Sequence, residues 1–170
     1  MKKNKISKNW INKQKKDIYV RQSKIEGYRS RAIYKLKEIQ EKYTVIKNGI
    51  SIVDLGSAPG SWSEYVTRRF KNTKVVSIDL KDMKPINNTF QIKGDFTLES
   101  NQQKILEYFN GKIDLVISDM AVNTTGNKSV DSLVTGELSL EAMKFALKTL
   151  KKNGIFVSKV FKVSKNLYFY

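Results

Sequence analysis

The stretch VDLGSAPGSWSEYV, residues 53–66, contains three local signals that together restrict the fold. An apolar, β-branched run leads into a turn bounded by Gly56 and Gly60, and the turn leads into apolar residues spaced three or four apart. The first run predicts a buried strand and the last predicts a helix. A strand joined to a helix by such a turn is typical of an open α/β sheet, in which ligands bind beyond the carboxyl ends of the strands. We therefore expect this turn beside a ligand site.

The rest of the chain repeats this alternation of strand and helix. Strands are predicted at residues 51–56, 74–80, 90–96, 112–121 and 154–161. Helical spacing is found at 33–43, 62–70, 97–109 and 140–150. This order predicts a Rossmann-like α/β fold, a mostly parallel sheet with helices on both faces. Residues 123–135 are predicted to form a polar loop at the carboxyl edge, where long loops are often functional.

Composition limits the chemistry that is possible. The chain has no cysteine and no histidine, so a thiolate metal site and a cysteine nucleophile are excluded, and acid–base work must fall to Lys, Asp, Glu or Tyr. We expect no bound metal. No apolar run of about 18 residues is present and no secretory signal is recognisable. The sequence therefore predicts a soluble, cytoplasmic protein, which we expect to be a monomer without a membrane partner.

Positive charge is concentrated near the N-terminus. The formal net charge is +16, and residues 1–35 hold 12 Lys or Arg against Asp17 and Glu26. A clustered basic segment favours a polyanionic partner, most often nucleic acid. A membrane surface is one alternative. Coding drift in an AT-biased genome is another, because Lys outnumbers Arg 27 to 5 along the whole chain.

The spacing of glycines and acids favours one class of cofactor. The turn is not G-x-G-x-x-G, which disfavours a dinucleotide and with it a nicotinamide-dependent oxidoreductase. Asp79 ends the second predicted strand and could accept both hydroxyls of a ribose. A nucleoside without a pyrophosphate fits both observations, and S-adenosylmethionine is the candidate. The alternative is an ordinary tight turn, with Asp79 capping a helix.

Two more polar residues are predicted at the same rim. Asp119 follows the apolar run DLVIS, and Lys159 stands in the run IFVSKVF, on the side of Ile155 and Val157. A lysine near an apolar strand face loses hydration, which disfavours its charged form and can prepare it as a base. Taken alone, Lys159 could equally be a surface lysine with a buried stem. Its pairing with Asp119 favours the functional interpretation.

These stretches resemble the FtsJ/RrmJ (RlmE) family of bacterial 2′-O-methyltransferases of large-subunit ribosomal RNA. The matching segments are RSRAIYKLKEI (29–39), VDLGSAPGSWSEYV (53–66), IDL (78–80), GDF (94–96), ISDMAVN (117–123) and KVF (159–161). The N-terminal segment SKNWINKQKKDIYV (7–20) is also similar to the family. The resemblance implies methyl transfer from S-adenosylmethionine to a uridine ribose of 23S RNA in the large subunit. It leaves open a relative that acts on transfer RNA or cap ribose.

The resemblance also implies roles for particular residues. The S-adenosylmethionine pocket would be lined by Gly60, Trp62, Asp79, Asp95 and Asp119, with Asp95 accepting from the adenine amino group. Lys35, Asp119 and Lys159 would be three members of a catalytic Lys-Asp-Lys-Glu tetrad. In this scheme Lys159 is the base, Lys35 lowers its pKa as a nearby cation, and Asp119 orients it.

The sequence departs from the family at two places. Val122 stands where the family usually has proline, and after Phe161 the chain reads KVSKNLYFY and ends without a counterpart of the tetrad glutamate. We therefore expect a basic arm at 1–28, a C-terminally incomplete methyltransferase domain at 29–170, and the strand 154–161 at the edge of the sheet. Activity could then be impaired, which leaves an RNA-binding remnant as an alternative function.

Overall fold

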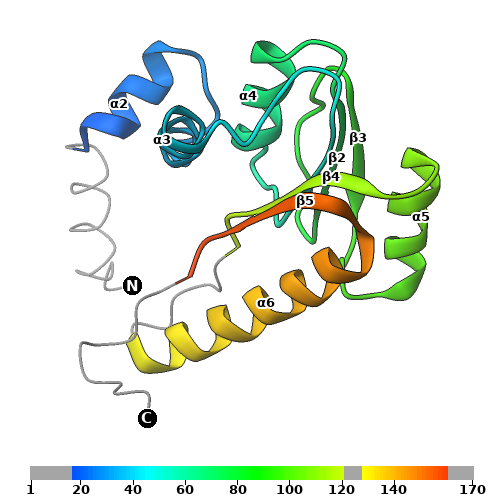
Figure 1. Cartoon of the computed structure of the whole chain (residues 1–170). Helices are drawn as coiled ribbons and strands as arrows, with labels where there is room; N and C mark the ends of the chain where they lie inside the picture. The colour runs from blue at the N-terminus through cyan, green and yellow to red at the C-terminus, as the bar shows by residue number, and fades with distance from the viewer. Residues whose placement is uncertain (1–16, 121–127, 161–170) are drawn as a thin grey trace.

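A five-stranded, all-parallel sheet in the order β3-β2-β1-β4-β5 forms the centre of the molecule (Figure 1). The structure is a computed structural model that describes residues 17–120 and 128–160. The strands are β1 Ser51–Leu55, β2 Lys74–Asp79, β3 Thr89–Lys93, β4 Ile113–Ser118 and β5 Leu150–Ser158. The helices are α2 Ile18–Ile25, α3 Ile33–Tyr43, α4 Ser61–Arg69, α5 Glu99–Phe109 and α6 Lys128–Thr149. The predicted α/β fold with a parallel sheet is confirmed.

Two apolar cores cover the two faces of the sheet. Alternate residues of β1 point to opposite faces, so Ile52 packs with Leu36 of α3 and Val66 of α4, whereas Val53 packs with Ile105 of α5 and Phe145 of α6. The central strands are buried on both sides, which explains why their sequences are nearly continuous apolar runs. Each predicted strand overlaps an observed one, because short apolar runs rich in β-branched residues are a clear signal of a strand.

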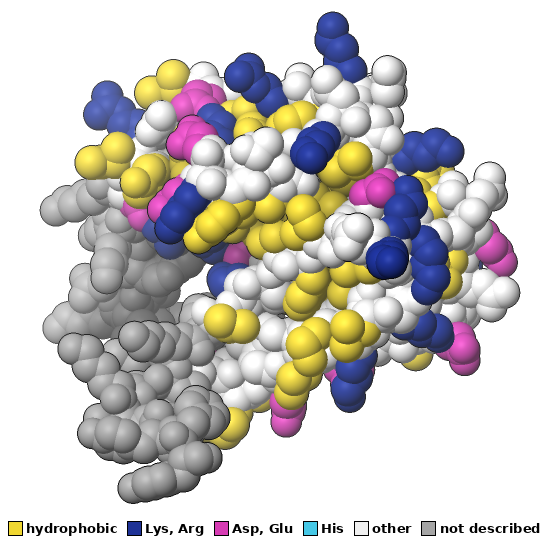
Figure 2. Space-filling view, viewed as in Figure 1, with side chains coloured by type: hydrophobic (Ala, Val, Ile, Leu, Met, Phe, Trp, Pro, Cys, Tyr) yellow, Lys and Arg dark blue, Asp and Glu magenta, His cyan; other side chains and the backbone are white. Residues whose placement is uncertain are grey.

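Helix α6 is longer than predicted. The face of α6 that packs against the sheet also differs from the predicted one. The predicted polar loop at 123–135 is wrong from residue 128 onward, where α6 begins, and 123–127 lie outside the described residues. The apolar residues that suggested the helix, Leu140, Met143 and Leu147, are exposed. Its buried side chains are mostly small or polar instead, and Figure 2 shows hydrophobic side chains on the surface over α6. Small and hydroxyl side chains let the helix approach the sheet closely.

Helix α2 occupies part of the predicted basic arm and lies beside α3 (Figure 1). Asp17 caps it by accepting from the Tyr19 N–H at 3.0 Å, and Asp17 also pairs with Arg31. The rings of Tyr19 and Tyr34 lie 5.2 Å apart. Residues 17–28 of the arm are therefore folded against α3, and residues 1–16 lie outside the described residues.

Strand β5 is an edge strand in the part of the chain that the structure describes, since it pairs with β4 alone. Ile155 pairs with Leu115 and Ser158 with Ser118, so the strand ends level with β4. The Lys159 N–H then donates to the Ser118 carbonyl at 2.9 Å. This pairing carries Lys159 to the carboxyl edge of the sheet, beside Asp119.

Replacement of Phe145 and of Leu147 tests which face of α6 is buried. Phe145 is 2% exposed and Leu147 is 76% exposed. We expect Phe145→Ala to lower the free energy of unfolding by about 3–5 kcal/mol, because it leaves a cavity against the sheet. Leu147→Ala, two positions further along the helix, should change it by no more than about 0.5 kcal/mol. Urea denaturation of both variants checks this, and similar losses in the two would contradict the packing of α6.

Candidate active site

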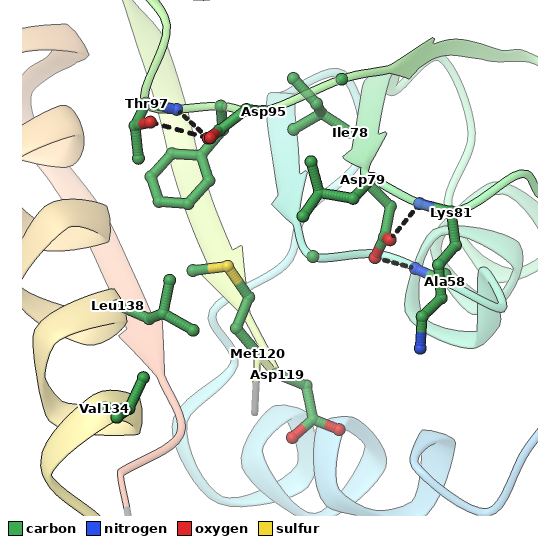
Figure 3. Close-up of a pocket in the computed structure, with 14 residues that line it drawn as sticks. Ala58, Ile78, Asp79, Lys81, Asp95, Thr97, Asp119, Met120, Val134 and Leu138 are labelled. Atoms are coloured by element: carbon green, nitrogen blue, oxygen red, sulfur yellow. Dashed lines mark hydrogen bonds between the residues drawn. The ribbon is translucent and has the colours of Figure 1, made fainter. Parts of the chain in front are cut away.

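A cavity of about 520 Å³ opens where β1, β2 and β4 end (Figure 3). The turn after β1, the loops after β2 and β3, the first residues after β4 and one turn of α6 all contribute to its wall. Its volume is within the range of small-molecule sites in proteins. Asp79, Asp95 and Asp119, three of the predicted site residues, line it.

Asp79 is fixed at the end of β2 by two backbone N–H groups. Its Oδ2 accepts from Ala58 at 2.9 Å and its Oδ1 accepts from Lys81 at 2.8 Å, so the carboxylate ties the turn after β1 to the loop after β2 (Figure 3). Each carboxylate oxygen has two lone pairs, so each can accept one further hydrogen bond. Asp79 can therefore receive a pair of ligand hydroxyls without losing its backbone contacts.

Asp95 lies across the cavity from Asp79, in the loop after β3 (Figure 3). Its Oδ1 accepts from the Thr97 N–H at 2.8 Å and from the Thr97 hydroxyl at 2.7 Å. Both bonds end on one oxygen, which leaves lone pairs on the other for a ligand donor.

The turn after β1 fits closely under Met120. Gly56 has φ of +68°, in the left-handed region, and a Cβ at this position would overlap the Cγ of Met120. Glycine is required here on both grounds, since it has no side chain and tolerates positive φ. The backbone of the turn thereby forms one wall of the cavity, next to Ala58 and Asp79.

Lys35, Asp119 and Lys159 form one ion cluster beside the cavity, although they are far apart in the sequence. The Lys35 Nζ lies 2.9 Å and 3.1 Å from the two carboxylate oxygens of Asp119. The Lys159 Nζ lies 2.9 Å from Asp119 Oδ1 and also donates to the Asp119 carbonyl at 2.9 Å. The side chain of Lys159 is 21% exposed and that of Lys35 is 53% exposed. Two ammonium groups thus share one carboxylate at the rim.

The site is thus a nucleoside-sized cavity with a lysine–aspartate–lysine cluster at its edge. Comparison of the sequence with known protein families identifies the family to which the chain belongs. The sequence profile of FtsJ-like methyltransferases matches residues 28–169. The chain belongs to the FtsJ-like methyltransferase family. This match spans the sheet, the cavity and all three residues of the cluster.

Relatives of this methyltransferase agree with that assignment. The protein named Ribosomal RNA large subunit methyltransferase E of Pelagibacter ubique is 62% identical over 161 residues, which cover 95% of this chain and 79% of the relative. The protein of the same name from Rickettsia akari is 44% identical and matches 92% of this chain and 71% of its own. A crystal structure of a candidate ribosomal RNA methyltransferase from Plasmodium falciparum has a TM-score of 0.72 at 35% identity, with 81% of each chain covered.

Two predicted cofactor residues of this methyltransferase lie outside the lining of the large cavity. Trp62 is 4% exposed, and its indole N–H donates to the Ala32 carbonyl at 2.8 Å. Gly60 has φ of +101° and lies against Arg29 and Ile86. Trp62 borders a small hollow that it shares with Asp119. Both residues support the turn, and direct contact with a cofactor stays a prediction.

Sequence reasoning missed Arg29, which holds the turn from outside. Its guanidinium donates to the carbonyls of Pro59, Lys84 and Pro85 at 2.7–3.2 Å and lies 3.5 Å from a carboxylate oxygen of Glu64. One side chain thus joins the turn after β1, the loop after β2 and helix α4. Nothing in RSRAIYKL distinguishes this arginine from a surface cation, because its partners come from distant segments.

Asp54 was also missed, although an acid inside the apolar strand IVDL is a recognisable signal. It is 1% exposed, and its Oδ2 accepts from the Ser63 N–H at 3.2 Å and hydroxyl at 2.7 Å. The Ser63 hydroxyl also lies 2.6 Å from that of Ser77. The pKa of Asp54 is raised to about 7, mainly because the carboxyl is buried. The hydrogen bonds from Ser63 lower this pKa, whereas the nearby charges of Asp119 and Asp79 raise it.

Within the residues that the structure describes, two other features are absent. No group of three or more acidic side chains is placed to hold a metal ion. No helix is long and apolar enough to cross a membrane.

The raised pKa of Asp54 gives a test based on stability. In the unfolded chain an aspartate has a pKa of about 4. Between about pH 4 and 7 the folded protein therefore binds a proton that the unfolded chain lacks, so the contribution of Asp54 to stability falls as pH rises through this window. Asp54→Asn removes this titration. We expect the melting temperature of the Asn variant to rise relative to that of the parent between pH 5 and pH 8, as measured by circular dichroism at constant ionic strength. A constant difference would contradict a raised pKa.

Proposed function

We propose that this methyltransferase transfers a methyl group from S-adenosylmethionine to the 2′-hydroxyl of a uridine in the 23S RNA of the large ribosomal subunit. The observation that carries the proposal is the contact of Lys35 and Lys159 with Asp119 at the edge of a nucleoside-sized cavity. Relatives that match most of this chain are named Ribosomal RNA large subunit methyltransferase E, which supports ribosomal RNA as the substrate.

The cavity has hydrogen-bond acceptors that suit the hydroxyls and the amino group of S-adenosylmethionine. Asp79 keeps lone pairs on both oxygens for the two ribose hydroxyls. Asp95 keeps a free oxygen for an exocyclic amino group of the base. A Cβ at Gly56 would intrude on Met120, so a small residue is needed where a ligand would approach the turn. The residues present therefore fit this cofactor, with Gly60 and Trp62 supporting the same turn.

The reaction requires removal of a proton from a weakly acidic ribose hydroxyl. When bound, S-adenosylmethionine supplies an electrophilic methyl group on a positively charged sulfur. We assign the proton to the Nζ of Lys159, which is the less exposed of the two lysines. To accept it, Nζ must first be neutral, and Asp119 then orients the amine through its carboxylate and its carbonyl. Lys35 holds Asp119 from the other side and fixes its position.

The charge of the chain is consistent with a ribosomal RNA partner. Residues 1–35 hold 12 of the 32 Lys and Arg. In the described part, Lys and Arg side chains are spread over the visible face together with Asp and Glu side chains (Figure 2). Distributed cations bind phosphates without reading sequence, so they supply affinity, whereas selection of one uridine must come from RNA shape and from the site itself.

Methyl transfer to purified subunits tests the proposed function. The 170-residue chain is mixed with radiolabelled S-adenosylmethionine and with large subunits from a strain that lacks this modification, and the labelled ribose is mapped. We expect label on one uridine of 23S RNA. Lys159→Ala should lower the turnover by about 10²–10⁴, the usual range for a positioned base, and should leave cofactor affinity unchanged. Lys152→Ala, at an exposed lysine on β5, the strand that Lys159 follows, is the matched control.

Each other result has a definite meaning. Label on transfer RNA or on cap ribose, and none on large subunits, would show that the substrate is RNA of that class instead. Binding of RNA without methyl transfer would identify the chain as an RNA-binding remnant. An active Lys159→Ala variant would show that another group takes the proton.

Replacement of Asp79 tests the cofactor assignment by itself. Asp79→Ala should weaken binding of S-adenosylmethionine about tenfold or more, because the ribose hydroxyls lose a charged acceptor. Asp82→Ala removes a carboxylate from the same loop, but one that is 79% exposed and faces Lys93, so it should have no effect. Isothermal titration calorimetry compares the two variants with the parent. Equal affinity in all three, or tighter binding of NAD than of S-adenosylmethionine, would exclude this pocket assignment.

A further inference from the structure

Helix α6 carries apolar side chains on two different faces. On the inner face, Phe145 and Ala146 pack against the sheet and are 2% exposed. On the outer face, four large apolar side chains are 40–76% exposed, namely Leu133, Leu140, Met143 and Leu147. Hydrophobic side chains are visible on the surface over α6 (Figure 2). A helix that is apolar around its circumference is normally buried on all sides, so the outer face of α6 is a candidate contact surface.

The spacing of these side chains indicates the kind of partner. Leu133, Leu140 and Leu147 are seven residues apart, so they lie in one row along the helix, about 21 Å long at a rise of 1.5 Å per residue. Apolar residues repeated every seven positions are the pattern by which two helices pack side by side. Gly136 and Met143 occupy the second position of the same repeat, three residues after a leucine. The outer face therefore suits another α-helix.

Gly136 supports this interpretation. A Cβ at this position would be in open space, with no other segment of the described part within 4 Å. The fold of one chain therefore does not require a glycine here, although glycine weakens the interior of a helix relative to alanine. A missing side chain on an outer face lets a side chain of a second helix approach closely. We therefore expect a large residue of the partner opposite Gly136.

The charged residues beside the row identify the partner as a second copy of this chain. Glu137 and Lys144 are seven residues apart and flank the row, one on each side of Leu140 along the helix. Glu137 is exposed and forms no ion pair with the residues that the structure describes, and Lys144 is 68% exposed although it contacts Glu141. A second α6 in the antiparallel direction brings the acid of each helix level with the lysine of the other. Two helices in the same direction and register cannot do this.

We propose that α6 is the contact surface of a homodimer in which two copies of the chain pair in antiparallel directions. Three contacts each join a residue of one copy to a residue of the other, namely Leu147 to Gly136, Leu140 to Met143 and Lys144 to Glu137. In an antiparallel pair, residues face each other when their numbers add to a constant, and for these three pairs that value differs by at most two. One register therefore satisfies all three contacts, and the two-fold axis gives each of them twice.

Assembly through α6 does not depend on the proposed function. It replaces the monomer expected from the sequence, where no apolar face was expected to be exposed. A contact through one helix of each copy is at the small end of specific interfaces, so we expect a dissociation constant on the order of 10–100 µM. At about 1 µM the chain is then monomeric, and denaturation at that concentration reports the stability of a single chain.

Sedimentation of the 170-residue chain tests the dimer. Between about 1 and 300 µM we expect the mass to increase from 19.6 kDa to twice that value. Leu140→Glu should weaken the association at least about tenfold, because it places a carboxylate in an apolar contact. Ile18→Glu, the same kind of change at a side chain of α2 that is 76% exposed, is the matched control and should leave the association unchanged. Urea denaturation at about 1 µM should give nearly the same free energy of unfolding for both variants and the parent.

Exchange of the charges tests the direction of the helices. Glu137→Lys places lysine at both flanking positions and Lys144→Glu places glutamate at both, so each variant alone should associate about three- to tenfold more weakly than the parent at low salt. A mixture of the two variants should regain the affinity of the parent, because each positive flank then meets a negative one. Sedimentation of the mixture with one variant labelled measures this affinity.

Four results would overturn the dimer. A constant mass of 19.6 kDa over the whole range would show that the face has no such partner. Association that Leu140→Glu does not weaken would show that another surface carries it. A Leu140→Glu variant with a clearly lower free energy of unfolding at about 1 µM would show that a segment of the same chain covers the face. A mixture of the charge variants that associates no better than each variant alone would contradict the antiparallel pairing.

Discussion

Asp119 is the residue on which the geometry of the site depends. It follows β4, which lies between β1 and the edge strand β5, and it contacts Lys35 of α3 and Lys159, which follows β5. Its carboxylate, 16% exposed, lies within ion-pair distance of both ammonium groups and so joins Lys35 to Lys159 at the rim. Removal of that charge would leave two cations near each other at the rim without a counter-charge, which is unfavourable. Chemistry and local folding therefore depend on the same contact.

The backbone of the site is set by polar side chains that reach the turn from three directions. Asp79 holds it from β2, Arg29 from the segment before α3, and Asp54 from beneath, through Ser63 at the start of α4. Charge-assisted bonds to backbone groups are stronger than neutral ones, so the turn is rigid before any ligand arrives. Such preorganisation favours binding because less order must be imposed on the protein when the ligand enters.

The sheet was predictable from the sequence because β1, β2 and β4 are buried on both faces, and their apolar runs therefore need no tertiary information. Asp79 and Asp119 were placed at one edge because each stands at the carboxyl end of a predicted strand, whereas Asp95 was expected only from the resemblance to the family. Helix α6 was harder to predict, since its exposed leucines suggested the wrong buried face and its hydroxyl-rich start was taken for a loop. Arg29 could not be found in this way, because its carbonyl partners are brought together only by the folded chain.

Helix α2 is attached to the domain mainly by charge. Ser23 is its one buried side chain, while Asp17 pairs with Arg31 and Glu26 pairs with Lys37 of α3 at 2.6 Å. Ion pairs at a surface weaken as salt rises, whereas the apolar cores of the sheet do not. The attachment of α2 to α3 should therefore be more sensitive to salt than the packing of the sheet. A polyanion that reached Arg31 or Lys37 would compete with Asp17 and Glu26 for the same cations, and its binding would loosen the attachment of α2 to α3.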